Sequence, residues 1–425
     1  MDIIIRAARI IDSAGNTAAR QQDILIRKGK IESIADHIPN DKKLKEVTGT
    51  NLHVSIGWVD MCAFIGDPGL EHREDLKSAI QSAAAGGFTT VLANPNTKPA
   101  LHSKSEIEYV IRKSSGSVVN ILPIGAISQD CKGVDLTEMH DMHEAGAVAF
   151  GDGFNSSLNA GITLRSLQYV KPFGGLIITH PFERNIAKSG QMNEGVTSTL
   201  LGMHGIPHLA EELMVKRDLD ILEYTGSRLH FAYVSTPASV EYVKKAKANG
   251  QLVTCSVTPY NLMLEDELVM EYDSNYKLMP PLRTKADNQA MVKALKDGTI
   301  DTIASFHIPH DPESKDLEFD MADFGMIAFE TTFALLNTHL GKKVGLETLI
   351  EKLTIGPRDI LGLEIPEIEE GAVADLTIFD PEEKWTFTVG DIKSRSKNSP
   401  FLGQEFTGRV VGIVNNGQVH LNENR

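Results

Sequence analysis

The sequence predicts an α/β protein whose main part is a closed (β/α)8 barrel. Short apolar runs alternate with amphipathic segments through the middle of the chain, a pattern typical of repeated strand and helix units around a parallel sheet. The candidate strands are residues 57–64, 89–96, 119–128, 147–153, 175–182, 229–236, 252–259 and 302–309. Eight such units make the barrel the leading architecture.

Two of the amphipathic segments end in glycine. Residues 74–87, EDLKSAIQSAAAGG, close on Gly86 and Gly87, and residues 237–250, PASVEYVKKAKANG, close on Gly250. Glycine is favoured just after a helix because it adopts left-handed backbone conformations without steric cost. We therefore expect two helices here, each turning back into a strand.

The two ends of the chain differ from the middle. Extended stretches in residues 1–55 and 366–425 carry turn signals such as Asn416-Gly417. These stretches are too short for separate cores, so we expect them to pair as one small β-sandwich domain. The barrel domain is then expected to span residues 56–365.

Composition narrows the classes of partner and the compartment. A formal charge of -15 would repel nucleic acid and anionic membrane, so we expect neither as a partner. The amino terminus lacks the apolar region of a signal peptide, and no apolar run approaches the roughly 20 residues of a membrane helix. Three widely separated cysteines, Cys62, Cys131 and Cys255, fit a reducing cytoplasm.

Six segments, in order along the chain, resemble dihydroorotases of the multi-domain, complex-forming bacterial type, within the cyclic amidohydrolase superfamily. They are AAAGGFTTVLANPNTKP, GQMNEGVTSTLLGMHGIPHLAEE, the stretch from YDSNYKLMPPLR to FHIPH, FGMIAFETTF, GAVADLTIFDP and SKNSPFLGQEFTGRVVGIVNNGQV. The resemblance implies hydrolysis and formation of a cyclic amide, dihydroorotate, in pyrimidine synthesis. It also implies one or two zinc ions at the carboxyl ends of the strands.

The positions where this family holds its metal carry other residues here. The two first-strand histidines fall on Cys62 and Phe64, the sixth-strand histidine falls on Tyr233, and the eighth-strand aspartate that serves as base falls on Phe306. Phenylalanine has no donor atom, and a lone cysteine is more often a buried small hydrophobe than a ligand. We therefore expect no metal, no zinc cofactor and no catalytic residue.

A few family positions keep their residue. His180 and, at most, Asp152 remain as potential metal ligands, although each also fits a structural role, as a hydrogen-bonded histidine and a turn residue. Asn96 and His310 match the family's substrate-binding positions. The family's arginine that binds the substrate carboxylate after the first strand falls on Gly66 in this chain.

The replacements suggest a repacked site. Phe64, Tyr233 and Phe306 all map to the barrel mouth, where each ring contributes about 1.5–3 kcal/mol if it is fully buried. His230 has the strand parity of neither family ligand and is interpreted as a packed core histidine.

Two classes of function compete. The first is a non-catalytic dihydroorotase homologue with a structural or regulatory role, with aspartate transcarbamoylase as the candidate partner and a homo-oligomer, by default a dimer, as the expected assembly. The alternative is an active dihydroorotase, or another cyclic amidohydrolase, with an unconventional site. A pure ligand-binding role is a third hypothesis.

Overall fold

The barrel predicted from the sequence is present in the computed structural model, which describes residues 2–12, 17–156 and 159–422. Eight strands form a sheet in the order β15-β14-β13-β10-β9-β8-β7-β6, and neighbouring strands pair in parallel. They are β6 (Trp58–Ala63), β7 (Phe88–Ala93), β8 (Asn120–Gly125), β9 (Ala149–Phe150), β10 (Ile177–Thr179), β13 (Leu229–Phe231), β14 (Val253–Val257) and β15 (Thr302–Ile303). Each lies within, or within one residue of, an apolar run that predicted it.

Several strands are much shorter than those runs. The run at 302–309 gives only Thr302–Ile303, and the run at 147–153 gives only Ala149–Phe150. The residues that follow β15 and β9 in these runs are largely buried, but they leave the ladder and form loops at the carboxyl end of the barrel. Apolar composition therefore predicted burial correctly and overestimated strand length.

The seam between the first and last strands is closed by hydrogen bonds outside the ladder. The Phe64 amide donates to the His307 carbonyl over 2.9 Å. The Ser305 amide donates to a carboxylate oxygen of Asp60 over 2.6 Å, and Asp60 is fully buried. These bonds join β6 to the segment that follows β15, so the eight strands form a nearly closed barrel.

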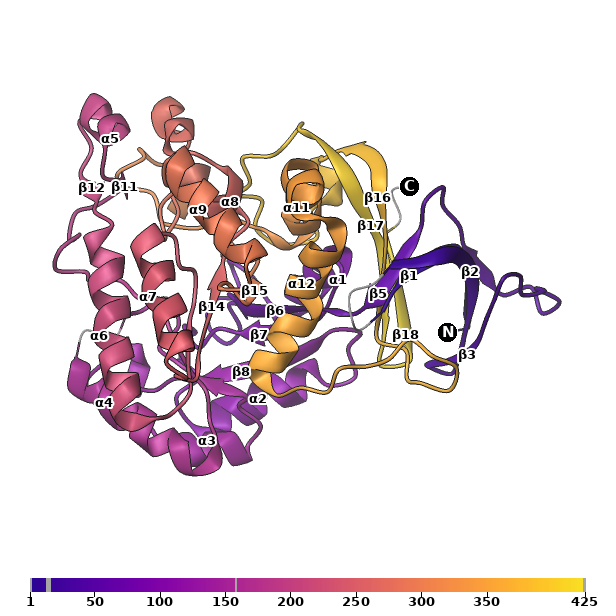
Figure 1. Ribbon diagram of the computed structural model, residues 1–425, viewed down its shortest axis with the longest axis horizontal. Coiled ribbons are helices and arrows are strands. Elements are labelled where there is room, and N and C mark those ends of the chain that lie inside the picture. Colours follow the sequence, from indigo (N-terminus) through magenta and orange to yellow (C-terminus); the bar gives the residue numbers. More distant parts are fainter. Residues whose placement is uncertain (1, 13–16, 157–158, 423–425) are drawn as a thin grey trace.

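Helices cover the outside of the barrel (Figure 1). The α-helices are α1 (Leu76–Ala85), α2 (Lys104–Ser114), α3 (Met139–Glu144), α4 (Ala160–Val170), α5 (Val196–Leu201), α6 (Leu209–Thr225), α7 (Pro237–Ala248), α8 (Tyr260–Met263), α9 (Lys285–Lys296), α10 (Pro312–Lys315), α11 (Phe329–Val344) and α12 (Leu346–Leu361). Both glycine-terminated helices are confirmed as α1 and α7, and Gly87 and Gly250 have the expected positive φ angles of 91° and 79°.

Short elements complete the barrel part. Short 3-10 helices lie at η1 (Gln129–Cys131), η2 (Lys171–Phe173), η3 (Asp266–Glu271) and η4 (Ser274–Tyr276), and a further one, η5 (Val389–Asp391), lies between β16 and β17 of the terminal sheet. A separate two-stranded parallel sheet pairs β11 (Met192–Asn193) with β12 (Gly205–Ile206).

Both ends of the chain form one further sheet, as predicted, at the right of Figure 1. Its order is β18-β17-β16-β5-β1-β2-β3, with β4 paired to β1. The strands are β1 (Ile3–Ile11), β2 (Thr17–Arg27), β3 (Lys30–Ala35), β4 (Lys45–Val47), β5 (His53–Ile56), β16 (Leu376–Thr386), β17 (Glu405–Asn415) and β18 (Gln418–Leu421). Ile3, Ile24, Val54 and Ile378 belong to the apolar core of this sheet, which fits a small β-sandwich.

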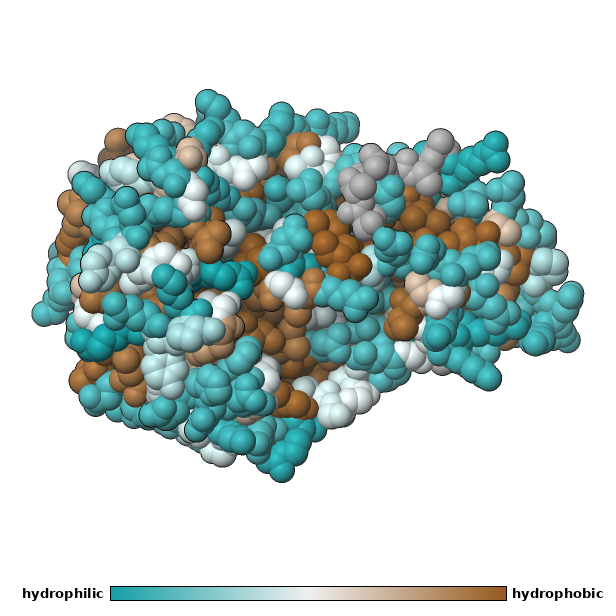
Figure 2. Space-filling view, turned by 60° about the horizontal axis from the view of Figure 1, so that its bottom comes forward, coloured by the Kyte–Doolittle hydropathy of each residue, from teal (hydrophilic) through white to brown (hydrophobic). Residues whose placement is uncertain are grey.

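The surface is mixed in character. Figure 2 shows a face largely covered by hydrophilic side chains, with hydrophobic ones gathered in a recess near its middle. None of the helices in the described ranges is long and apolar enough to cross a membrane.

One buried arginine connects the terminal sheet to the barrel. The Arg358 guanidinium donates to the Gly57 carbonyl over 2.7 Å and lies 2.8 Å from the Asp375 carboxylate, with the Arg358 side chain 3% exposed. Gly57 is the one residue between β5 and β6, so this contact holds the point where the chain passes from sheet to barrel.

We expect Arg358→Met to lower the free energy of unfolding by about 3 kcal/mol, because it leaves a buried carbonyl and a carboxylate without their partner. Urea denaturation provides the measurement. As a control, Arg112→Met alters a side chain that is 76% exposed and should change stability by less than about 0.5 kcal/mol. Equal effects of the two substitutions would contradict the role assigned to Arg358.

Candidate functional site

An open cavity of about 790 Å³ lies where the strands end at the carboxyl side of the barrel. Loops that follow several different strands line it, and they contribute Phe64, Arg73, Asn96, His180, Phe306 and His310. Barrels of this type place their functional groups on these loops, because the carboxyl ends of all eight strands converge there. The cavity is therefore the candidate site.

Aromatic rings fill the inner part of this site. Tyr233 and Phe306 are each 1% exposed and meet edge to face, with ring centroids 5.1 Å apart and planes at 87°. The Tyr233 hydroxyl donates to the Cys62 carbonyl over 2.5 Å, so the buried phenol has a partner. Phe64 is 2% exposed and lines the cavity. The rings pack the interior as predicted, although a large cavity remains outside them.

The backbone at two of these positions is strained. Tyr233 has a φ angle of 60° and Phe306 has 63°, in the left-handed region that bulky side chains rarely adopt. Each such residue costs about 1–3 kcal/mol and persists only where its surroundings hold it. Here the Tyr233 amide donates to the Ser256 hydroxyl, and the amides on either side of Phe306 are also bonded.

Cys62 is buried and engaged. Its sulfur accepts a hydrogen bond from the Asn94 side-chain amide over 3.1 Å. Burial raises the pKa of the Cys62 thiol to about 12, so the reactive thiolate is disfavoured at neutral pH. It fits the expected structural cysteine.

His180 lies at the inner wall of the cavity. It is 4% exposed and meets the Tyr233 ring edge to face at 5.9 Å. Burial, with a smaller contribution from the charge of Arg184, lowers the pKa of the imidazole to about 4, so the ring is neutral near pH 7. Within residues 2–12, 17–156 and 159–422, its Nδ1 atom has no hydrogen-bond partner.

Asp152 is committed to another contact. Its two carboxylate oxygens accept hydrogen bonds from the Ser128 amide, over 3.0 Å, and from the Ser128 hydroxyl, over 2.6 Å. Burial raises the pKa of this carboxyl to about 6. Across the part of the chain that the structure describes, no three histidine, cysteine, aspartate or glutamate residues are grouped so that they could hold a metal ion.

Asn96 and His310, the predicted substrate-binding residues, both line the cavity. The Asn96 side-chain amide donates to the Asp152 carbonyl over 3.1 Å and its oxygen accepts from the Phe154 amide over 2.8 Å, so it also braces a loop. Nε2 of His310 is 3.0 Å from the Phe324 carbonyl. Burial, and then the charge of Arg73, lower the pKa of His310 to about 3, so this ring is neutral as well.

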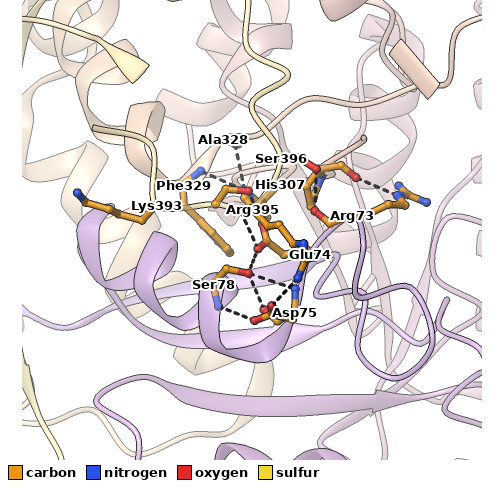
Figure 3. Close-up of polar contacts among 12 residues, drawn as sticks. Arg73, Glu74, Asp75, Ser78, His307, Ala328, Phe329, Lys393, Arg395 and Ser396 are labelled. Atoms are coloured by element: carbon orange, nitrogen blue, oxygen red, sulfur yellow. Dashed lines mark hydrogen bonds and ion pairs between the residues drawn. The ribbon is translucent and has the colours of Figure 1, made fainter. Parts of the chain in front are cut away.

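Beside the cavity, a buried polar cluster centres on Glu74 (Figure 3). The Glu74 carboxylate accepts from the hydroxyls of Ser78 and Ser394 and from the Arg395 amide, 3.0 Å away. Nδ1 of His307 accepts from the Ala328 amide over 3.1 Å, so its proton is on Nε2, which faces Glu74 at 3.4 Å. The cluster ties the loop after β6 to the segment after β15.

Several cavity residues were not predicted from the sequence. Arg73 follows β6, Phe154 follows β9, and Phe182, Arg184 and Lys188 follow β10. None belongs to a motif, and only their place in loops after strand ends could have indicated them. They give the cavity aromatic walls and positive charge.

Two family models match the chain. One described as dihydro-orotase-like matches residues 52–239, and one described as amidohydrolase family matches residues 179–420. Together with the barrel, these matches define an amidohydrolase-type protein.

Full-length relatives identify the family more closely. A dihydroorotase of Geotalea daltonii is 40% identical over 421 residues, which cover 99% of each chain. A dihydroorotase of a Thermoanaerobacter species is 40% identical over 430 residues, covering 100% of this chain and 98% of that protein. The chain belongs to the dihydroorotase family.

Solved structures share the fold. An L-hydantoinase from Arthrobacter aurescens superposes with a TM-score of 0.86 at 24% identity, covering 100% of this chain and 97% of that one. A dihydropyrimidinase from Brevibacillus agri superposes with a TM-score of 0.82 at 19% identity, covering 100% and 96%. Identities at this level support the common architecture and nothing finer.

His230 is a packed core histidine, as interpreted from the sequence. It is fully buried, and its Nδ1 lies 2.9 Å from the Thr254 hydroxyl. Burial lowers the pKa of this imidazole from 6.5 to about 3. The unfolded chain therefore takes up this proton at a higher pH than the native state does, so the native state loses stability as the pH falls below 6.5.

Between pH 8 and pH 5 the unmodified protein should lose unfolding free energy as the pH falls. We expect this loss to be about 2 kcal/mol smaller in His230→Gln. Urea titrations at the two pH values measure it, and any constant cost of the substitution cancels in the difference. His204→Gln, at an exposed histidine, should keep the original pH dependence. An unchanged pH dependence in His230→Gln would contradict the neutral buried state.

Proposed function

We propose that this chain is a non-catalytic member of the dihydroorotase family, with a structural or regulatory role in pyrimidine synthesis. The observation that carries the proposal is the packed pair of Tyr233 and Phe306 at the inner end of the site, where the family resemblance implies a metal ligand and a base. The pathway assignment rests on full-length similarity to proteins named dihydroorotase.

The chemistry of the donor set supports this role. Hydrolysis of a cyclic amide needs an activated water and a group that accepts its proton, and a catalytic zinc usually takes three protein ligands. Of the two potential ligands, Asp152 is occupied by Ser128, and His180 faces the Tyr233 ring. These residues do not fit the zinc centre that the resemblance implies, and we derive no catalytic step through it.

An active hydrolase with an unconventional site is the alternative. The observation in its favour is that Asn96 and His310 still line a cavity large enough for a small cyclic amide. The alternative would need a water-activating group there. Asp60 and Asp152 both have a pKa raised to about 6, but Asp60 is fully buried and bonded to the Ser305 amide, and Asp152 accepts from Ser128, so both are poorly placed for the task.

The test combines metal analysis of the purified protein with dihydroorotate turnover assays in both directions. We expect no stoichiometric zinc and no turnover, and we expect Phe306→Asp to remain inactive because it restores a base without a metal. That variant also places a carboxyl among aromatic rings, which should lower stability by several kcal/mol.

A matched control introduces aspartate at an exposed position away from the aromatic rings. Val134→Asp adds the same charge on a side chain that is 63% exposed and should leave stability nearly unchanged. Metal-dependent turnover in the unmodified protein or in Phe306→Asp would overturn the non-catalytic assignment.

The proposed role requires protein contacts, and the described surface offers an apolar region that suits them. Val196 and Leu200 of α5 are 77% and 71% exposed, and Met270 of η3 is 48% exposed. Helix α5 and η3 pack on each other. Exposed apolar side chains grouped on adjacent elements are typical of interaction surfaces.

We propose aspartate transcarbamoylase from the same organism as the partner, together with self-association. Co-expressed proteins should elute together in size-exclusion chromatography, and Val196→Asp with Leu200→Asp should weaken the complex at least tenfold. Val389→Asp, at a 58% exposed position of η5, should not. Separate elution of the two proteins at micromolar concentration, with this chain as a monomer, would contradict the proposal.

A further inference from the structure

We propose that the barrel-mouth cavity binds a small planar aromatic anion, a carboxylate or a phosphate ester, that it does not chemically transform. The inference rests on the proposed non-catalytic function, because it assigns the site a bound ligand in place of a reaction. The cavity, at about 790 Å³, falls in the size range of small-molecule sites, about 300–1,000 Å³.

The walls suit a flat ring. Phe64, Phe154, Phe182 and Phe306 all line the cavity, and they come from loops after four different strands. Phe154 and Phe306 meet at 6.5 Å with planes at 73°, and Phe182 lies 6.5 Å from the His180 ring. Phe154 and Phe182 are only half-buried. An aromatic ligand would cover them and gain both buried area and favourable ring contacts.

The charge of the cavity selects an anion. Among its lining residues Arg73, Arg184 and Lys188 are cationic, and Asp323 is the one carboxylate. This local excess of positive charge stands on a protein of net charge -15. It would repel divalent cations and draw a carboxylate or phosphate toward the opening.

Arg73 is the innermost of these cations. Its guanidinium carbon lies 4.2 Å from the centre of the Phe64 ring, and its Nε donates to the Pro309 carbonyl over 3.0 Å. In Figure 3 its side chain extends away from the Glu74 cluster, while the Ser396 hydroxyl holds its carbonyl. An Arg73 guanidinium nitrogen lies 3.3 Å from Nε2 of His310, and the charges of Asp323 and Asp311 act on the half-buried group, but none of the ion pairs within the described ranges includes it. A half-buried guanidinium without a carboxylate partner is suited to an incoming anion.

The polar groups beside Arg73 add hydrogen bonding without charge. His180 and His310 are both neutral rings on the cavity wall, and the buried Nδ1 of His180 has no partner among the described residues. The site therefore combines stacking surfaces, fixed cations and neutral hydrogen-bonding rings.

Fluorescence titration with 2-naphthoate tests the inference on the intact protein. We expect saturable binding, at least tenfold weaker binding of the uncharged 2-naphthamide, and weaker binding of the non-planar decahydro-2-naphthoate. A parallel titration with 2-naphthyl phosphate distinguishes the two anion sources, because the tighter binder identifies whether the site suits carboxylate or phosphate. Raised salt should weaken binding of both anions.

Substitutions at the exposed rim locate the bound probe. Arg184→Gln with Lys188→Gln should weaken 2-naphthoate binding about tenfold, whereas Arg165→Gln with Lys216→Gln makes the same charge change on exposed residues of α4 and α6 and should leave binding unchanged. Absence of saturable binding, equal binding of the amide, or equal effects of the two double variants would overturn the inference. Dihydroorotate turnover alongside rim-dependent naphthoate binding would instead overturn the non-catalytic function and leave the anion site standing.

Discussion

The seam between β6 and the segment after β15 is the contact on which the rest of the molecule depends. A barrel is closed only when its first and last strands are joined, and among the described residues no strand ladder joins β6 to the two-residue strand β15. The bonds from Ser305 to Asp60 and from Phe64 to His307 take the place of the ladder. The buried carboxylate of Glu74 also contacts the His307 side chain, at 3.4 Å from Nε2.

These seam contacts also determine the geometry of the site. Phe64 is itself a seam residue and Phe306 lies between two others, Ser305 and His307, so the bonds that close the barrel also place both rings at the inner end of the cavity. The left-handed backbone at Phe306 is tolerated because the amides of Ser305 and His307 are both satisfied. Strain of this kind persists where surrounding contacts overdetermine the conformation.

The interior of the site is packed with aromatic rings. An unpaired carboxylate or imidazole buried there would cost several kcal/mol or change its protonation, and the neutral state of His180 and the raised pKa of Asp152 illustrate this pressure. Tyr233 and Phe306 avoid that cost by burying apolar surface, and the single buried hydroxyl of Tyr233 is satisfied by a carbonyl. The exposed cations Arg184 and Lys188 lie at the outer part of the cavity, where contact with solvent lowers the desolvation cost of their charges.

The sequence by itself determined the eight barrel strands and the pairing of the two ends, because runs of apolar residues and turn signals are properties of neighbouring residues. Local motifs likewise showed which residues occupy the family's site positions. It also indicated that Asn96, His180 and His310 lie at strand ends. Only the tertiary structure decided that Asp152 turns to Ser128, and that Arg73, Arg184 and Lys188 converge on one cavity. Strand ends brought together from distant parts of the chain create those contacts, and no local pattern encodes which loop side chains will face one another.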